Sequence, residues 1–185
     1  MAQYNLAAPL SDADAAMLRT GDIVLLSGII YAARDSAHKQ LVTLLDEGKP
    51  LPIDLKGAVI YYVGPTPPPP GYALGSAGPT SSYRMDAYAP RLYSLGVKAS
   101  IGKGQRGGPV IEAMKQYGGV YFGATGGAGA FYASCIKASK IVAFPEMGPE
   151  ALRELRVENL PLVVINDSVG GELYAKPQLD KARAL

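Results

Sequence analysis

Short apolar runs alternate along this chain with segments of helical periodicity. The first run, Asp22–Ile30, is almost continuously apolar, which indicates a strand that is buried on both faces. The runs that predict further strands are Ala58–Val63, Lys98–Ile101, Val120–Phe122, Ile141–Phe144 and Leu162–Ile165, and the last two are expected to be buried. Glu172–Tyr174 predicts a closing strand. Because strands alternate with helices, we expect a layered α/β domain with a mixed sheet.

Caps and prolines mark the helix boundaries. Ser11 and Asp14 have the spacing of a capping box, which predicts a helix over about Asp12–Arg19. The other predicted helices start at Asp35 or Ser36, at Thr80, at Pro109 and at Ala130, and the last of them ends near Lys137. Pro90 should kink or restart the helix that begins at Thr80, because proline disrupts a helix interior.

Length and composition fit one folded domain. The 185 residues are 48% hydrophobic and 18% charged, so the chain can bury a core, and we expect a single domain over residues 1–185. The net charge of +2 gives no reason to expect a nucleic-acid partner. The N-terminal residues lack the pattern of a signal peptide, and no apolar run reaches the ~18 residues of a membrane span. We therefore expect a cytoplasmic protein without membrane association.

The chain has few residues with reactive side chains. Cys135 is its single cysteine and His38 its single histidine. These two residues cannot form an internal disulfide, build a Cys/His zinc site or hold an iron–sulfur cluster, so no metal site is expected in this chain. The apolar surroundings of Cys135 predict a buried structural thiol.

The segment Gly64–Pro79 contains six prolines and four glycines. Its run of four prolines favours polyproline II. Neither side of the segment has enough predicted strands for a domain of its own, so we interpret it as a long loop and not as a linker. Long ordered loops in compact domains are usually functional.

Two glycine-rich turns are candidates for anion binding. Gly102–Gly107 matches the dinucleotide pattern G-x-G-x-x-G between a strand and a helix, but the acidic residue expected about 20 residues later is missing. The remaining interpretations are an anion pocket that includes Lys103 and Arg106, or a plain turn into a helix. Gly123–Gly129 is more typical of a tight turn or of close helix–sheet packing.

Cationic and hydroxyl side chains follow two of the predicted strands. Arg34 follows the strand at Asp22–Ile30, where a guanidinium could bind a carboxylate in bidentate fashion, or could simply pair with Asp35 on the surface. His38 is then either a base or a solvated side chain. Thr80 and Arg84 lie four residues apart where a helix should begin, which suits a small dicarboxylate but also an ordinary cap.

Six segments of the chain follow one another in a specific order. They read GDIVLLSGIIYAARDSAHK at 21–39, GPTSSYRMDAY at 78–88, IGKG at 101–104, GGVYFGATGGAG at 118–129, FPEMG at 144–148 and INDSVG at 165–170. In this order they resemble the β subunit, or C-terminal domain, of class I fumarate hydratase and L-tartrate dehydratase. The resemblance covers about Pro9–Tyr174. The chain departs from the pattern at Ser81, at Pro90 and at the Gly-Gly-Pro that follows Arg106.

The resemblance implies a hydro-lyase that is active only as a complex. The family fold is a swivelling β/β/α-type domain. The implied function is that of the β subunit of an iron–sulfur-dependent fumarate hydratase, an enzyme of the tricarboxylic acid cycle, with L-tartrate dehydratase as the alternative. This chain alone binds no cofactor; a 4Fe-4S cluster is expected on a partner α subunit in an α2β2 heterotetramer.

The same resemblance assigns roles to four residues. Arg34 and Arg84 resemble the carboxylate-binding arginines, and Lys103 resembles the lysine that contacts a dicarboxylate substrate. Thr80 resembles the catalytic threonine that takes part in proton transfer at carbon. Two other classes of function remain open beside this one, a non-catalytic anion- or nucleotide-binding module and a stand-alone nucleotide-dependent enzyme.

Overall fold

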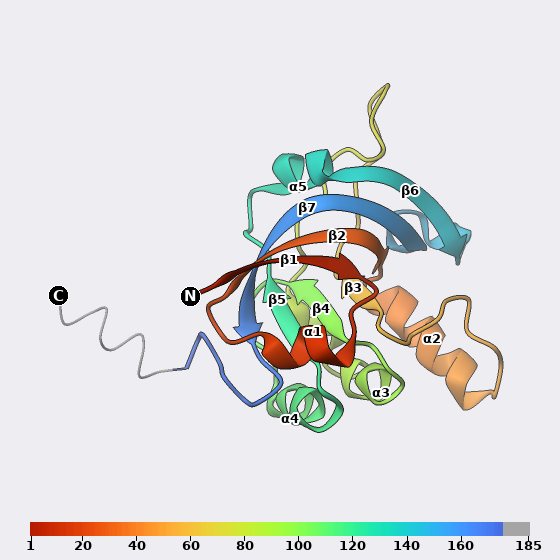
Figure 1. The fold of residues 1–185 in the computed structure, drawn as a ribbon. Coiled ribbons are helices and arrows are strands. Elements are labelled where there is room, and N and C mark those ends of the chain that lie inside the picture. Colours follow the sequence, from red (N-terminus) through yellow and green to blue (C-terminus); the bar gives the residue numbers. More distant parts are fainter. Residues whose placement is uncertain (176–185) are drawn as a thin grey trace.

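The strands of this protein form one sheet that closes on itself (Figure 1). The computed structural model describes residues 1–175. Its strands are β1 (Gln3–Ala8), β2 (Ile23–Ala32), β3 (Val59–Tyr61), β4 (Ala99–Gly102), β5 (Val120–Gly123), β6 (Ile136–Ala143) and β7 (Leu152–Asn166). The sheet order is β1-β2-β3-β4-β5-β7-β6, and β2 also pairs with β7. The circuit from β2 through β3, β4, β5 and β7 back to β2 is therefore closed.

The sheet is mixed, as predicted. Strands β1 to β5 are parallel to their neighbours, whereas β7 runs antiparallel to β2, β5 and β6. The α-helices are α1 (Asp12–Met17), α2 (Asp35–Asp46), α3 (Ala89–Ser94), α4 (Gly108–Tyr117) and α5 (Gly129–Cys135), and two 3₁₀ helices are η1 (Ser82–Met85) and η2 (Pro145–Glu150). The α/β class is confirmed; the swivelling motion implied by the resemblance stays a prediction.

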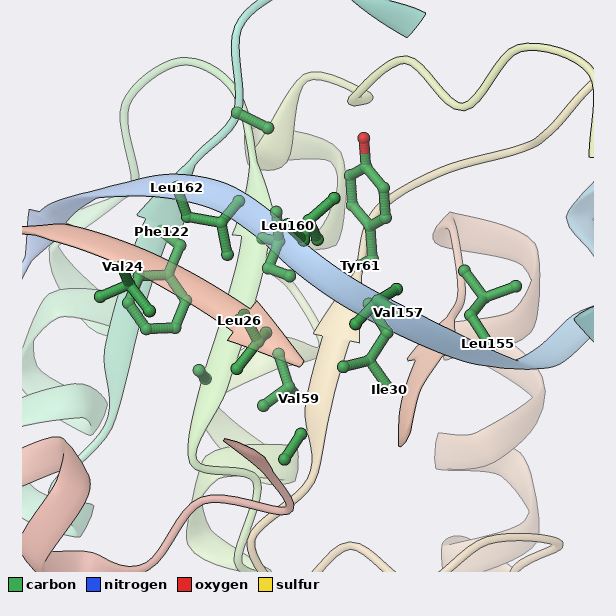
Figure 2. Packing of buried hydrophobic residues seen from close by; sticks show 14 of the residues in the cluster. Val24, Leu26, Ile30, Val59, Tyr61, Phe122, Leu155, Val157, Leu160 and Leu162 are labelled. Atoms are coloured by element: carbon green, nitrogen blue, oxygen red, sulfur yellow. The ribbon is translucent and has the colours of Figure 1, made fainter. Parts of the chain in front are cut away.

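Strand β3 separates two apolar cores because its side chains alternate between its faces. Val59 and Tyr61 pack into a core against β2 and β7, shown in Figure 2. Ile60 and Tyr62 pack into a second core with residues of α2, α3 and α4. Figure 1 accordingly shows these three helices on one side of β3–β5, while β1, β2 and β7 lie on the other. The result is three layers, two of strands and one of helices.

The predicted burial of two strands is wrong. Only one face of β2 is fully buried, with Val24, Leu26, Ile30 and Ala32 inside and the intervening residues partly exposed. The reason is that β2 belongs to an outer layer, whereas a strand buried on both faces needs cover on both sides, as β3 has. The run at Ile141–Phe144 lies at the end of β6, where Ile141 is 39% exposed.

Several boundaries follow local chemistry. The capping box of Ser11 and Asp14 is formed, although α1 ends at Met17. Pro90 lies in the first turn of α3. It therefore begins a new helix after η1 and does not kink a continuous one. The predicted helix up to Lys137 ends at Cys135, where β6 begins directly. The predicted closing strand Glu172–Tyr174 is not formed. Only Glu172 pairs, through an isolated bridge with Asn166.

The proline-rich segment Gly64–Pro79 projects from the molecule as a loop, the thin yellow trace in Figure 1. Thr66 holds its neck together through backbone hydrogen bonds with Gly75 and Ser76. Strands before and after the loop join the same sheet, so it is not a linker between domains. The expectation of one domain also covers residues 176–185, which lie outside the described residues. In the described part, no helix has the length and apolar character needed to cross a bilayer.

Candidate active site

Three segments meet at the carboxyl edge of the parallel strands. Arg34 follows β2 and begins α2, Thr80 returns from the proline-rich loop after β3, Arg84 lies in η1, and Lys103 follows β4. Ligands in α/β proteins bind at this edge because the connecting loops converge there. These side chains line one open hollow of about 390 Å³. Its full lining is Arg34, Pro79, Thr80, Ser81, Tyr83, Arg84 and Lys103.

Backbone pairing sets Thr80 beside Lys103. The amide of Thr80 donates to the carbonyl of Tyr62 (2.7 Å), and Lys103 donates to the carbonyl of Thr80 (3.3 Å). Ser82 donates in turn to the carbonyl of Lys103 (2.9 Å). The close contact between β4 and the segment with Ser82 requires a glycine at position 102, because a Cβ there would lie 2.0 Å from the Ser82 hydroxyl oxygen. The loop and β4 thus form a short extension of the sheet at the hollow.

Carboxylates hold the two arginines. Glu150 accepts an ion pair from Arg34 (Nη2 to Oε1, 2.9 Å). Asp35 accepts a hydrogen bond from Arg84 (Nη2 to Oδ2, 2.8 Å), and its other oxygen lies 3.7 Å from Nε of Arg34. Gly64 leaves room for this arrangement, since a Cβ there would lie 3.0 Å from Arg34 Cδ. Both guanidiniums are therefore preoriented at the hollow.

Comparison with known proteins agrees with this arrangement of segments. Residues 1–177 match the family described as Fumarase C-terminus. The chain belongs to this family. The resemblance seen in the sequence motifs is thereby confirmed.

Individual relatives of the fumarase C-terminus family differ in length. Fumarate hydratase 2 of Leishmania major is 41% identical over 158 residues, which cover 84% of this chain and 28% of that protein. The aerobic class I fumarate hydratase of Escherichia coli K12 is 40% identical over 156 residues, covering 83% and 28%. A Methanocaldococcus jannaschii protein named "Putative L(+)-tartrate dehydratase subunit beta" is 38% identical over 171 residues, covering 89% and 88%. The chain thus spans less than a third of these two fumarate hydratases.

His38 contacts the backbone of Arg34 in this member of the fumarase C-terminus family. Its side chain is fully buried, so the expectation of a solvated histidine is wrong. Nδ1 lies 2.8 Å from the carbonyl of Arg34, which can only accept, so Nδ1 carries the proton. Burial lowers the pKa of His38 to about 4. The ring is therefore neutral at pH 7, and it does not line the hollow.

Arg106 does not share an anion pocket with Lys103, contrary to the sequence-based interpretation. Its side chain is 0% exposed and pairs through Nε with Asp86 (2.8 Å). The second oxygen of Asp86 accepts from the amide of Gly107 (2.7 Å), at the N-terminus of α4. The amide of Gly107 and the guanidinium of Arg106, two donors that an anion would need here, are thus already used. The plain turn into a helix is the interpretation that fits.

Two further predictions concern residues away from the hollow. Gly129 lies in close helix–loop packing, since a Cβ there would lie 2.2 Å from the Ser76 hydroxyl oxygen. Cys135 is buried and free, as predicted. The residues of this chain do not fit an iron–sulfur cluster: within residues 1–175 no three His, Cys, Asp or Glu side chains gather to hold a metal.

Sequence reasoning missed the carboxylates that hold the arginines. Asp35 was seen only as a helix cap or as a surface partner for Arg34, and nothing drew attention to Glu150. Glu150 lies 116 positions after Arg34 and reaches it because β7 returns beside β2. The signal was present in one form, since FPEMG at 144–148 leads directly to Glu150.

Proposed function

We propose that this chain is the β subunit of a two-subunit, iron–sulfur-dependent fumarate hydratase, which reversibly hydrates fumarate to L-malate. The observation that supports this most is the hollow, where two arginines, a lysine and a threonine from separate segments converge. A dicarboxylate needs cationic anchors and a group that moves a proton at carbon. The names of the two fumarate hydratase relatives point to the same substrate.

Arg34 and Arg84 bind the substrate carboxylates in this proposal. Both guanidinium side chains line the hollow and stay partly exposed beside their carboxylates, Arg34 by 21% and Arg84 by 40%. Asp35 and Glu150 hold the planar groups still, so less side-chain entropy is lost on binding. The orientation of the substrate then depends on these two guanidinium groups, which their carboxylate partners hold at one side of the hollow.

Thr80 and Lys103 act at the reacting carbons. The Thr80 hydroxyl takes part in proton transfer at carbon, where removal of a proton places negative charge on the adjacent carboxylate. The Lys103 ammonium contacts the substrate and stabilises that charge, and this attraction becomes stronger once a partner excludes water from the hollow. The backbone pairing of the two segments places both side chains at the same hollow.

The remaining part of the active site belongs to a partner. The hollow is open, and this chain offers no cluster ligands within its described residues. We propose that an α subunit carries the 4Fe-4S cluster and faces the hollow in a cytoplasmic α2β2 heterotetramer. The naming of the Methanocaldococcus jannaschii relative as a subunit beta supports a separate partner chain.

A second candidate is the β subunit of L-tartrate dehydratase. It is favoured by that same relative, 88% of whose length this chain matches. The four side chains of the hollow would bind either hydroxy-dicarboxylate. A nucleotide-binding module has less support, because Asp86 already uses the amide of Gly107.

The test is turnover by the complex of this chain with its cysteine-containing α subunit. Fumarate, L-malate, L-tartrate and their methylated analogues are assayed separately. We expect the highest kcat/KM with fumarate and L-malate; preference for L-tartrate would select the second candidate. Turnover of none of these acids by an iron-replete complex would contradict both.

Thr80→Val within the same complex tests the proton-transfer role. The substitution is nearly isosteric but removes the hydroxyl, so kcat should fall on the order of 10²-fold or more. The alternative of an ordinary helix cap is wrong, because the N-cap of η1 is Ser81 and no side chain caps this helix. A Thr80 hydroxyl without a role in the reaction would leave turnover near normal. Steady-state kinetics paired with thermal melts separate the two outcomes.

A further inference from the structure

The hydroxyl of a buried tyrosine joins two of the three segments that carry the hollow's side chains, the one with Thr80 and Arg84 and the one with Lys103. Tyr121 lies in β5 and is 0% exposed. Its oxygen lies 2.8 Å from Oγ of Ser82 and 2.9 Å from the carbonyl oxygen of Gly104. The carbonyl can only accept, so Tyr121 donates to Gly104 and Ser82 donates to Tyr121. Every hydrogen of this pair of bonds is thereby assigned.

Both partners of the hydroxyl are neighbours of residues of the hollow. Ser82 lies between Thr80 and Arg84, and Gly104 directly follows Lys103. The two segments are otherwise joined by a short pairing, an isolated bridge between Ser81 and Lys103. One of its bonds, from Lys103 to the carbonyl of Thr80, is long at 3.3 Å. The hydroxyl of Tyr121 is a further contact to both segments, and it therefore limits sliding of one segment along the other.

The tyrosine ring is itself held. The Arg106 guanidinium lies 5.1 Å from the ring centroid of Tyr121 and 5.2 Å from that of Tyr62, within cation–π range of both. Asp86 fixes this guanidinium from the other side. Burial raises the pKa of Tyr121, so the hydroxyl stays protonated and remains a donor.

We propose that Tyr121 is a positioning residue of this site, which sets Thr80 and Arg84 relative to Lys103. The proposal deepens the proposed function and rests on it for its kinetic test. Misplacing groups by about 1 Å can cost on the order of 10²-fold in rate. Loss of the hydroxyl should therefore affect catalysis more than overall stability.

Tyr93 provides a matched control. Its hydroxyl is also buried, lies 2.8 Å from Oγ of Ser100 and donates to the carbonyl of Val120 (3.1 Å). Neither partner lines the hollow. Tyr121→Phe and Tyr93→Phe thus remove the same atom from similar surroundings. The two variants differ in one respect: the hydroxyl of Tyr121 joins two segments of the site, and the hydroxyl of Tyr93 does not.

The kinetic experiment compares both variants in the reconstituted complex. We expect Tyr121→Phe to lower kcat/KM about 10- to 100-fold. Tyr93→Phe should keep wild-type kinetics while both variants lower the melting temperature similarly. Equal kinetics of the two variants would overturn the proposal. Ser82→Ala removes the partner hydroxyl without changing β5 and should reproduce the kinetic loss, which keeps the test valid if Tyr121→Phe does not fold.

A second readout does not depend on activity. Amide hydrogen exchange of the full chain reports the bonds that Ser82 and Lys103 donate. These two amides should exchange faster in Tyr121→Phe than in wild type or Tyr93→Phe, and unchanged exchange would overturn the proposal. If the wild-type complex hydrates no dicarboxylate, the proposed function fails, while this exchange comparison still decides the role of Tyr121.

Discussion

Asp35 is the carboxylate on which both arginines of the hollow converge. Its two oxygens face Arg84 and Arg34, at 2.8 and 3.7 Å. Two guanidiniums close together repel each other, and a shared carboxylate offsets that repulsion. Glu150 contributes a second negative charge at Arg34. With Lys103 included, the hollow keeps an excess of positive charge, which suits a dianion.

Arg84→Lys should lower kcat/KM of the complex roughly 30-fold or more. Lysine keeps the charge but loses the planar fork, and losing a charged contact that substrate and partner would bury in the complex costs about 2–5 kcal/mol. Steady-state kinetics with the preferred dicarboxylate provide the measurement. Arg91→Lys is the matched control, because Arg91 pairs with Asp46 away from the hollow. Normal kcat/KM in both variants would contradict the assignment of Arg84.

His38 should make stability depend on pH in acid. Burial holds the pKa of His38 in the folded protein at about 4, below the ordinary histidine value of about 6.5, so the unfolded chain binds the extra proton first. The free energy of unfolding should therefore fall as pH drops from about 6.5 towards 4, with a slope approaching 1.4 kcal/mol per pH unit. Chemical denaturation across this range measures the slope.

His38→Asn is the control for this pH dependence. Asparagine can still donate to the carbonyl of Arg34 but does not titrate. The slope between pH 6.5 and 4 should flatten in this variant. Asp22 and Asp167 also have lowered pKa values, so their contribution is lost only at lower pH, below 3.8. An unchanged slope in His38→Asn would assign the acid sensitivity to other groups.

At the scale of elements, the junction of β4 with the loop depends on a missing side chain. A Cβ at Gly102 would lie 2.0 Å from Oγ of Ser82 and 3.3 Å from the carbonyl oxygen of Thr80. Gly102→Ala should therefore lower the free energy of unfolding by about 1–3 kcal/mol and also reduce turnover. Thermal melts and kinetics of the complex measure the two effects.

Gly108→Ala is the matched control for this junction. Gly108 begins α4, and a Cβ there would meet nothing within 4 Å. Alanine should be neutral or stabilising in that place, since it is the better helix former. If both alanine variants melted like the wild type, close packing at Gly102 would not be required.

The elements that could be predicted carry their signal locally. The capping box of α1, the proline that starts α3 and the apolar run of β3 are each read within a few residues. Strand β1 escaped prediction because its residues are mostly polar or small. In β7, charged residues separate the apolar ones at irregular spacings of two and three, and Pro161 interrupts the pattern, so only its end resembles a strand.

The hollow was predictable in its members but not in its support. Arg34, Thr80, Arg84 and Lys103 could be selected because they follow strands and match family motifs. The hydrogen bond between Tyr121 and Ser82 and the ion pair of Arg34 with Glu150 join residues far apart in sequence. Such contacts depend on which strands become neighbours, and no local pattern states that.

At the scale of the whole molecule, the chain should contribute only half of a reaction centre. We expect the purified chain to contain no iron and to show no hydratase activity, because cluster binding normally uses several thiolates and this chain has one. Metal analysis and a fumarate assay on the chain alone provide the measurement. The complex with the α subunit is the positive control. Stoichiometric iron–sulfur absorbance in the isolated chain would overturn the subunit assignment.

The closed circuit of strands has a consequence for synthesis. Strand β2 pairs with β7 along nearly its whole length, yet the paired residues Ile23 and Val163 are 140 positions apart. A ribosome releases β2 long before it releases β7, so the nascent chain carries an open strand edge for most of its translation. Strand β7, the last strand among residues 1–175, closes the ring. The circuit of strands should therefore form only after β7 has left the ribosome.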